Sequence, residues 1–473
     1  FLIFDNNVSI YCYQFLIKNY ELQIISGRYT MNQDMKTQLL TKSPRELLFK
    51  LAIPGIIGMV VIGLYPFMDG VFAGRIIGDY AMSAISISMS LTLINGAVSA
   101  LLGVGSASIL SRAIGKGDTE TVDKIFGNVC YWVLLFSALI TAAGVLSAPY
   151  FLEMVGAKGA IKDLGVRYLR IVFLGSVFVN FAQAGNMTMR GEGALKQSMF
   201  IMGAGALLNI VLDPVFMLLM GEYAIEGAAI ATVLSQMVQA VLTLRYFAKK
   251  SPFVKIHKIK KYKEIYREMF GIGSSAMLMQ LLFAVQQTVL FKQAFTFGGD
   301  NWGILMSATM RLYMFSFIPL WGMSQGLQPV IGANYGAKQY GRVRETMKLF
   351  MYGATLLAAL SWVPAMLFSE SLLSIFNVRP EIIAAGLINF KLFYSTFILY
   401  GIMIMTLTFF QSIGDAKKAG MIVLLRQLIL FVPAMLILPH LFGNLAVWWA
   451  EPAVDFTMIL IGFIMQQRVL RKL

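Results

Sequence analysis

The chain has 473 residues, of which 58% are hydrophobic and only 13% are charged. Soluble domains carry about 25% charged residues, so this composition is that of a membrane protein, and domain counts based on soluble proteins do not apply. The net charge of +15 comes from basic residues in short loops between apolar runs. This placement is typical of a polytopic membrane protein and argues against a nucleic-acid partner.

The first thirty residues differ from the rest of the chain. They are too interrupted by polar residues to span a bilayer, and they lack the basic start and the small-residue cleavage site of a signal peptide. A polar leader, MNQDMKTQLLTKSPRELLFK, begins at Met31. We therefore interpret residues 1–44 as an N-terminal leader, within which residues 1–30 could be a non-native extension.

Twelve apolar runs follow the leader. A run of about 20 mainly apolar residues is long enough to cross a bilayer as a helix. The runs therefore predict an all-α integral membrane protein with twelve transmembrane helices. In chain order they cover residues 47–74, 80–113, 124–148, 161–187, 195–220, 224–248, 266–297, 301–333, 345–368, 381–411, 416–441 and 445–467.

Basic residues gather in the loops that follow even-numbered runs and at both ends of the chain. The opposite loops hold few others beyond Arg75, Lys158, Lys162 and Arg379. Because basic loops stay in the cytoplasm, both termini are expected on the cytoplasmic side of the cell membrane. The basic stretch 249–264 then reads as a cytoplasmic linker. It would join an N-lobe of helices 1–6 (45–248) to a C-lobe of helices 7–12 (265–473).

The two halves resemble each other at a constant offset of 221 residues. GSASILSRAIGKG (105–117) falls on GLQPVIGANYGAK (326–338), and RGEGALK (190–196) falls on QSIGDAK (411–417). Agreement at two distant places without a gap indicates a duplication. Because each half has six spans, both insert the same way round and are related by a pseudo-two-fold axis along the membrane normal. This arrangement, with a central cleft, is typical of a transporter.

Several motifs carry a resemblance to a known family. MDGVFAGRIIG (68–78), RGEG (190–193), NIVLDPVF (209–216) and EGAAIAT (226–232), within two related halves, resemble the MATE (multidrug and toxic compound extrusion) family. The RGEG form is most similar to its bacterial MepA-like and DinF-like branch, and the similarity covers about residues 45–470. The resemblance implies a V-shaped, two-lobed fold and exchange of drugs for cations.

The segment NIVLDPVF places polar residues inside an apolar run. Asn209 and Asp213 are four residues apart, so they share one face of a helix and both oxygens can serve one small cation. An ionised aspartate at mid-membrane costs about 3 kcal/mol, so such residues usually face a cavity or a partner and mark ion pathways. Pro214 loosens the helix at this point. The alternative is a buried polar pair that only holds helices together.

Asp69, Tyr168 and Thr232 are expected at the same depth of the N-lobe as this pair. The resemblance implies that Asp69, Asn209, Asp213 and Thr232 form the coupling site for H⁺ or Na⁺, with Tyr168 as a hydrogen-bonding neighbour. Two carboxyls close together in a low dielectric do not readily both ionise, so the site is suited to load a proton, or to hold Na⁺ with both acids charged. Alternatively, Thr232 bonds its own helix and Tyr168 sits in the interfacial belt.

Other polar residues and two prolines extend this prediction. The secondary candidates for lining a cavity are Asn180, Asn186, Gln280 and Gln287. Two prolines inside predicted spans, Pro54 and Pro214, are candidate hinges. The resemblance implies a proton-dependent bend near Pro54, and the alternative is a static kink.

The C-lobe departs from the family branch that uses acids in spans seven and ten. Spans 266–297 and 381–411 hold acidic residues only at their ends. Six intramembrane charges are instead expected to form structural pairs, the alternative being a second coupling site. They are Lys292, Arg311, Lys391, Arg426, Glu451 and Asp455. The 30 Met and 35 Phe residues mostly pack helices, and some are expected to line a cavity for varied ligands.

The predicted function is multidrug efflux by alternating access, in which lipophilic and often cationic drugs leave in exchange for H⁺ or Na⁺. The alternative is a lipid-linked oligosaccharide flippase of the same superfamily. An enzyme is not expected, because no nucleophile–base or metal constellation is present; Cys12, Cys130, His257 and His440 are isolated, and no Walker motif appears. We expect a monomer without a cofactor, whose partners are small-molecule drugs and membrane lipids and include no nucleic acid.

Overall fold

The computed structural model describes residues 35–154, 158–256, 259–376 and 378–473, without some of the side chains between residues 64 and 90. Within these residues the chain is helical and contains no strand. The predictions for residues 1–34, Cys12 and His257 lie outside the described residues. Cys130 is buried and forms no disulfide.

The first half of the chain forms an N-lobe of long helices. Helices α5 and α6 bend by 55° at Gly175 and together make one crossing. The elements are α2 (Pro44–Ile76), α3 (Asp79–Lys116), α4 (Thr119–Met154), α5 (Gly159–Leu174), α6 (Ser176–Gly191), α7 (Leu195–Met220), the 3₁₀ turn η1 (Gly221–Tyr223) and α8 (Ala224–Lys249).

The second half forms a C-lobe. Its longest element, α9 (Lys263–Gly336), is two helices joined at Gly299, whose φ of 65° and ψ of −166° only glycine adopts readily. The remaining elements are α10 (Tyr340–Leu367), α11 (Ser369–Ser374), α12 (Pro380–Tyr394), α13 (Phe397–Ile413), α14 (Ala416–Leu424), the π-helical turn η2 (Leu425–Leu430), α15 (Phe431–Phe442) and α16 (Leu445–Lys472).

Each of the twelve predicted spans corresponds to one helix or to one broken pair. By length and composition, nine described stretches can cross a membrane, and the bent α5–α6 pair makes a tenth. Two of these stretches, Leu195–Lys249 and Lys263–Gly336, are long enough to cross twice and turn back near Gly221 and Gly299. The prediction of twelve transmembrane helices is therefore confirmed.

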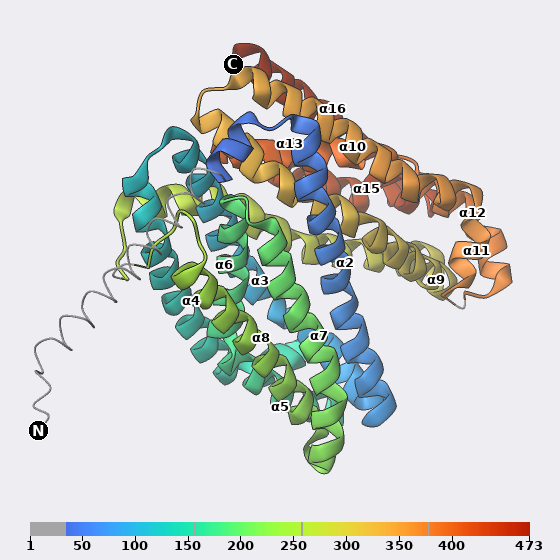
Figure 1. The fold of residues 1–473 in the computed structure, drawn as a ribbon. Coiled ribbons are helices and arrows are strands. Elements are labelled where there is room, and N and C mark those ends of the chain that lie inside the picture. The colour runs from blue at the N-terminus through green and yellow to red at the C-terminus, as the bar shows by residue number, and fades with distance from the viewer. Residues whose placement is uncertain (1–34, 155–157, 257–258, 377) are drawn as a thin grey trace, which may run out of the picture.

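The two lobes form a V. Figure 1 shows α2–α8 and α9–α16 as two bundles that meet at one end and diverge toward the other. Each lobe has its own apolar core, and the core of the C-lobe is the larger. Large apolar side chains such as Leu146, Phe200 and Leu219 are exposed on the outside, as expected for surfaces that face lipid acyl chains.

Backbone geometry repeats at the offset of 221 residues that relates the halves. Gly78 and Gly299 both have positive φ, and so do Gly193 and Gly414. The same offset relates Gly117 to Lys338, the one non-glycine residue with positive φ in the described chain. Turns and helix ends therefore recur at equivalent places, as expected if a six-helix unit was duplicated.

The lobes touch through glycines at the end of the V that carries the loops 117–118, 192–194, 250–262, 337–339 and 414–415, which we call the basic end. A Cβ placed on Gly115 would lie 2.0 Å from the carbonyl oxygen of Ala333, and one on Gly336 would lie 2.2 Å from that of Arg112. The offset of 221 turns one contact into the other. The pseudo-two-fold axis therefore passes between α3 and the second half of α9, where the backbones lie against each other.

Candidate functional site

A buried polar cluster joins α7 and α8 in the N-lobe. The Asn209 side-chain amide donates a hydrogen bond to Oδ1 of Asp213 over 2.9 Å, and a longer one to Oγ1 of Thr232 over 3.4 Å. All three side chains are at most 3% exposed. Asn209 and Asp213 share one face of α7, as their spacing predicts, and Thr232 faces them from α8.

The close approach of α7 and α8 brings these residues together. The two helices are joined by η1, which follows directly on α7 and leads into α8. At the joined end the backbones nearly touch, because a Cβ on Gly227 would lie 2.7 Å from the carbonyl oxygen of Phe216. Glycine at this position therefore allows the hydroxyl of Thr232 to reach the amide of Asn209.

Two other residues were predicted to belong to this cluster. Tyr168, on α5, is 4% exposed and packs in the apolar cluster that contains Met217 and Ala228. These two residues lie one turn from Asp213 and Thr232, so Tyr168 lies beside the polar cluster. Asp69 belongs to α2, and its side chain lies outside the described part of the structure.

The polar cluster offers oxygen atoms to a small cation. Oδ1 of Asn209 accepts no hydrogen bond from any residue that the structure describes. Together with the carboxylate of Asp213 and the hydroxyl of Thr232, it makes up the donor set that hard cations prefer, and the carboxylate alone can bind a proton. No group of three or more His, Cys, Asp and Glu side chains is placed to hold a metal ion within the described residues.

Two secondary candidates lie apart from this cluster. Asn186 donates hydrogen bonds to the carbonyl oxygen of Ala182 and to Thr243, which is three helical turns from Thr232 on α8. Asn180 accepts a hydrogen bond from Ser99 and donates to Asn95 and Ser137. The Asn180 network ties α3, α4 and α6 together in the fully buried interior.

Three of the six predicted intramembrane charges form one buried group. Nε of Arg426 lies 2.7 Å from Oδ1 of Asp455, and Nη2 lies 3.7 Å from Oε1 of Glu451. Arg426 stands on the π-helical turn η2, and both acids stand one turn apart on α16. The widened turn of a π-helix often occurs at functional positions.

The other three charges are placed differently. Lys292 and Arg311 are exposed and Lys391 is half-buried. None of the three forms an ion pair with a residue in the described part of the chain. The buried group therefore depends on Arg426 rather than on Arg311.

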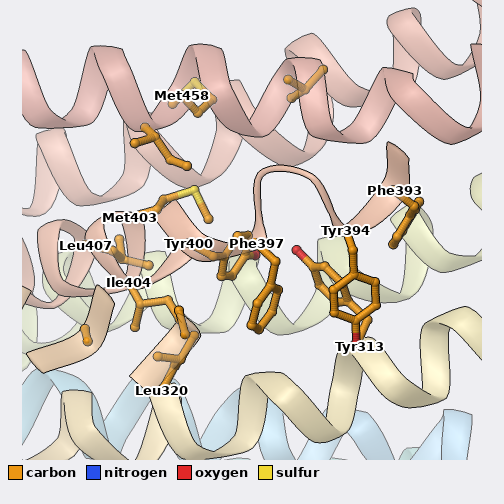
Figure 2. Packing of buried hydrophobic residues seen from close by; sticks show 14 of the residues in the cluster. Tyr313, Leu320, Phe393, Tyr394, Phe397, Tyr400, Met403, Ile404, Leu407 and Met458 are labelled. Carbon is orange, nitrogen blue, oxygen red and sulfur yellow. The ribbon is translucent and has the colours of Figure 1, made fainter. Parts of the chain in front are cut away.

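A cavity of about 330 Å³ opens beside the buried charges. Its walls come mainly from the C-lobe, while Met59 and Leu93 close it from the N-lobe. Figure 2 shows Tyr313, Phe397 and Tyr400 gathered beside the break between α12 and α13. Gln280 lines the cavity as predicted for a cavity residue, and Gln286 lines it in place of the predicted Gln287.

Comparison with known proteins identifies the family. The sequence model of the MatE family matches residues 54–215 and 305–436, more than half of the chain. The chain belongs to the MatE family. Two similar relatives are the multidrug export proteins MepA of Staphylococcus saprophyticus, 24% identical, and Staphylococcus aureus, 25% identical. Each alignment covers 92% of this chain and 98% of the relative.

Solved structures agree with this assignment. A MATE crystal structure in the bent conformation superimposes with a TM-score of 0.86 at 26% identity. A multidrug resistance MATE family transporter in an outward-facing conformation superimposes with a TM-score of 0.85 at 26% identity. Both alignments cover 92% of this chain and 98% of the other. The V-shaped MATE fold is thus confirmed, and this MATE protein is a transporter rather than an enzyme.

In this MATE chain the candidate hinges lie inside helices. α2 continues as a helix across Pro54, and α7 continues across Pro214. Next to Pro54, a Cβ on Gly55 would lie 2.4 Å from the carbonyl oxygen of Gly322 in the C-lobe. Pro54 therefore stands where the two lobes cross most closely along α2.

Polar contacts add to the glycine contacts at the basic end of this MATE protein. Nη2 of Arg112, on α3, lies 2.8 Å from Oε1 of Glu268 on α9. Arg190, in the RGEG motif, donates to the side-chain oxygen of Gln325 over 2.8 Å. Both contacts join the N-lobe to the C-lobe, so the lobes are held together at this end.

The RGEG motif also contains a buried acid to which the sequence assigned no role. Glu192 follows α6, is fully buried and accepts hydrogen bonds from the hydroxyls of Tyr246 and Ser251. Burial raises the pKa of Glu192 to about 7, against the lowering effect of these hydrogen bonds. Ser251 begins the connection between the lobes, so Glu192 anchors that connection to the N-lobe. Only the unusual acid between two glycines could have drawn attention to it.

Proposed function

We propose that the protein is a multidrug efflux antiporter. It exports lipophilic, often cationic drugs from the cytoplasm and takes up H⁺, Na⁺ or both in exchange. Its relatives are named as multidrug export proteins, and they align with nearly the whole chain. The enrichment of basic residues in the loops of one end supports a position in the cell membrane with both termini in the cytoplasm.

The observation that carries this proposal is the buried Asn209–Asp213–Thr232 cluster. An aspartate inside a membrane-spanning helix binds a cation or a proton more readily than it stays ionised without one. Asp69, on the neighbouring α2, would complete the coupling site, with Tyr168 beside it. Loading this site from outside and emptying it inside would supply the free energy for export.

The lobes would alternate between two arrangements. With the basic end in the cytoplasm, close contact between the lobes at that end corresponds to an outward-facing state. Inward opening would separate α3 from the second half of α9, with bending near Pro54 and Pro214 as hinges. We place the flexible connection at residues 249–264, between lobes 45–248 and 265–473. A single chain contains both lobes, so a monomer would suffice.

Dye efflux from proteoliposomes tests this proposal. Purified protein is reconstituted, loaded with a fluorescent cationic dye, and exposed to a pH gradient or to a sodium gradient imposed separately. Efflux driven by one of the gradients, and abolished when an ionophore collapses it, supports antiport and names the coupling ion. No dye movement under either gradient would contradict the proposal. Movement of lipid-linked oligosaccharide in the same vesicles would then support the flippase alternative.

A further inference from the structure

The buried charges of the C-lobe are not balanced. Arg426 supplies one positive charge, whereas Glu451 and Asp455 supply two negative charges when both are ionised. Asp455 is partnered on both oxygens, since Nε of Arg426 lies 2.7 Å from Oδ1 and the hydroxyl of Tyr313 donates to Oδ2 over 3.5 Å. The group is neutral only when one further positive charge joins the second carboxylate.

Glu451 is the carboxylate with unused capacity. Its Oε1 accepts a hydrogen bond from the Gln286 amide over 2.7 Å. Its Oε2 is buried and has no hydrogen-bond partner among the residues that the structure includes, although the residue is only 3% exposed. Glu451 also lines the 330 Å³ cavity. A buried carboxylate oxygen without a partner at a cavity wall is where a ligand can complete the pairing.

The walls of the cavity suit a lipophilic cation. Five of its lining side chains are aromatic: Phe283, Tyr313, Phe317, Trp321 and Tyr400. The faces of such rings attract organic cations, and this attraction increases when water is excluded. Several methionines, among them Met279 and Met310, add polarizable surface that adapts to ligands of different shape. The volume falls in the range of about 300–1,000 Å³ that small-molecule sites occupy.

We propose that this C-lobe cavity binds a lipophilic organic monocation, with the Glu451 carboxylate as its counter-ion and the aromatic rings as its walls. The inference rests on the drug export proposed above. It adds a ligand site that is separate from the polar cluster of the N-lobe. Met59 and Leu93 supply the N-lobe side of the wall, so separating the lobes along this wall would open the cavity.

Binding at this site exchanges one positive charge for another. In the absence of ligand a proton on Glu451 neutralises the group, and the organic cation replaces that proton when it binds. The titratable and charged groups around Glu451 are Asp455 on α16, Arg426 on η2, Tyr313 on α9 and Tyr400 on α13. Because Arg426 and Asp455 already pair, Glu451 is the group whose proton the ligand displaces.

Equilibrium binding of tetraphenylphosphonium to the purified full-length protein tests the site. We expect Glu451→Gln to weaken binding about tenfold or more at about pH 8, where the wild-type carboxylate is available, and to remove the loss of affinity toward about pH 6. The neutral triphenylphosphine oxide should bind both proteins alike. Glu381→Gln, an exposed residue at the start of α12, is the matched control and should bind as the wild type does.

Proton release gives a second measurement that needs no variant of the buried group. In weak buffer, wild-type protein should release about one proton for each tetraphenylphosphonium bound, and Asp213→Asn should release the same amount. Unchanged affinity in Glu451→Gln, or binding without proton release, would overturn the inference. Failure of the wild type to move dye under either gradient would instead contradict the export function, so the two failures can be told apart.

Discussion

Asp213 is the residue on which the proposed exchange depends. Replacing it with asparagine keeps the volume and one oxygen, so packing beside Pro214 should survive while the titratable charge disappears. We expect Asp213→Asn to abolish gradient-driven efflux and to leave folding and direct dye binding largely intact. Efflux by the variant in a pump-deficient host, together with dye binding to purified protein, checks this expectation.

The control is Asp163→Asn, which makes the same change at an exposed position on α5. It should keep full efflux. Asp69→Asn should behave like Asp213→Asn, and the double variant should be no worse than either, because residues that act as one unit are not additive. Wild-type efflux from Asp213→Asn would mean that the cluster only packs α7 against α8.

Glu192 predicts how stability depends on pH. Its pKa is about 7 in the folded protein and near 4.5 in the unfolded chain, because burial disfavours the carboxylate. The folded state therefore binds a proton more tightly, and this stabilisation is present below about pH 4.5 and is lost as the pH rises to about 7. The loss amounts to about 3 kcal/mol.

Glu192→Gln removes this titration and keeps the side-chain oxygen for Tyr246 and Ser251. The unfolding temperature in detergent should therefore fall less steeply between about pH 5 and about pH 7 in this variant than in the wild type. Glu222→Gln, at an exposed position in η1, should keep the wild-type slope. Parallel slopes for Glu192→Gln and the wild type would show that Glu192 does not titrate in this range.

At the scale of elements, the duplication exposes a strained helix end. Gly117 ends α3 in the left-handed conformation with φ of 77°, and its equivalent after α9 is Lys338 with φ of 61°. A side chain in this conformation costs about 1 kcal/mol relative to glycine. We expect Lys338→Gly to raise the unfolding temperature in detergent and Gly117→Ala to lower it.

The control for these substitutions is Gly420→Ala within α14, where no atom would lie within 4 Å of the added methyl group and φ is negative. It should be neutral or slightly stabilising, because alanine favours a helix over glycine. If Lys338→Gly destabilises the protein, its side chain contributes more at the basic end than its backbone strain removes.

At the scale of the whole molecule, the glycine contacts at the basic end control how the lobes separate. A methyl group on Gly115 would lie 2.0 Å from the carbonyl oxygen of Ala333, so the two backbones must move apart. We expect Gly115→Ala, and equally its symmetry mate Gly336→Ala, to shift the lobes toward an open basic end by about 1 kcal/mol, or severalfold in population.

A cysteine at Ser108 reports this opening, because Ser108 is fully buried and its hydroxyl donates to the carbonyl oxygen of Gln411 in the C-lobe. In a background without Cys12 and Cys130, a polar thiol reagent should label Ser108→Cys severalfold faster when Gly115→Ala is added. Gly420→Ala should leave the rate unchanged. An unchanged rate with Gly115→Ala would show that the lobes do not part at this contact.

The architecture could be predicted because it depends on properties that are read along the chain. Crossing a bilayer requires length and apolarity within one segment, so the twelve spans were visible in the sequence, and so was the offset of 221 residues. The spacing of Asn209 and Asp213 likewise predicts a shared helical face. These relations are local, or repeat at a constant distance, so no knowledge of packing was needed.

What the tertiary structure decided are the partners that come from different helices. The sequence offered Arg311 and Arg426 equally to Glu451 and Asp455, and only the rotation of η2 against α16 selects Arg426. The choice of Gln286 over the adjacent Gln287 is of the same kind, because neighbouring residues on a helix point about 100° apart. Helix rotation is set by packing against the surrounding helices, which a linear pattern does not contain.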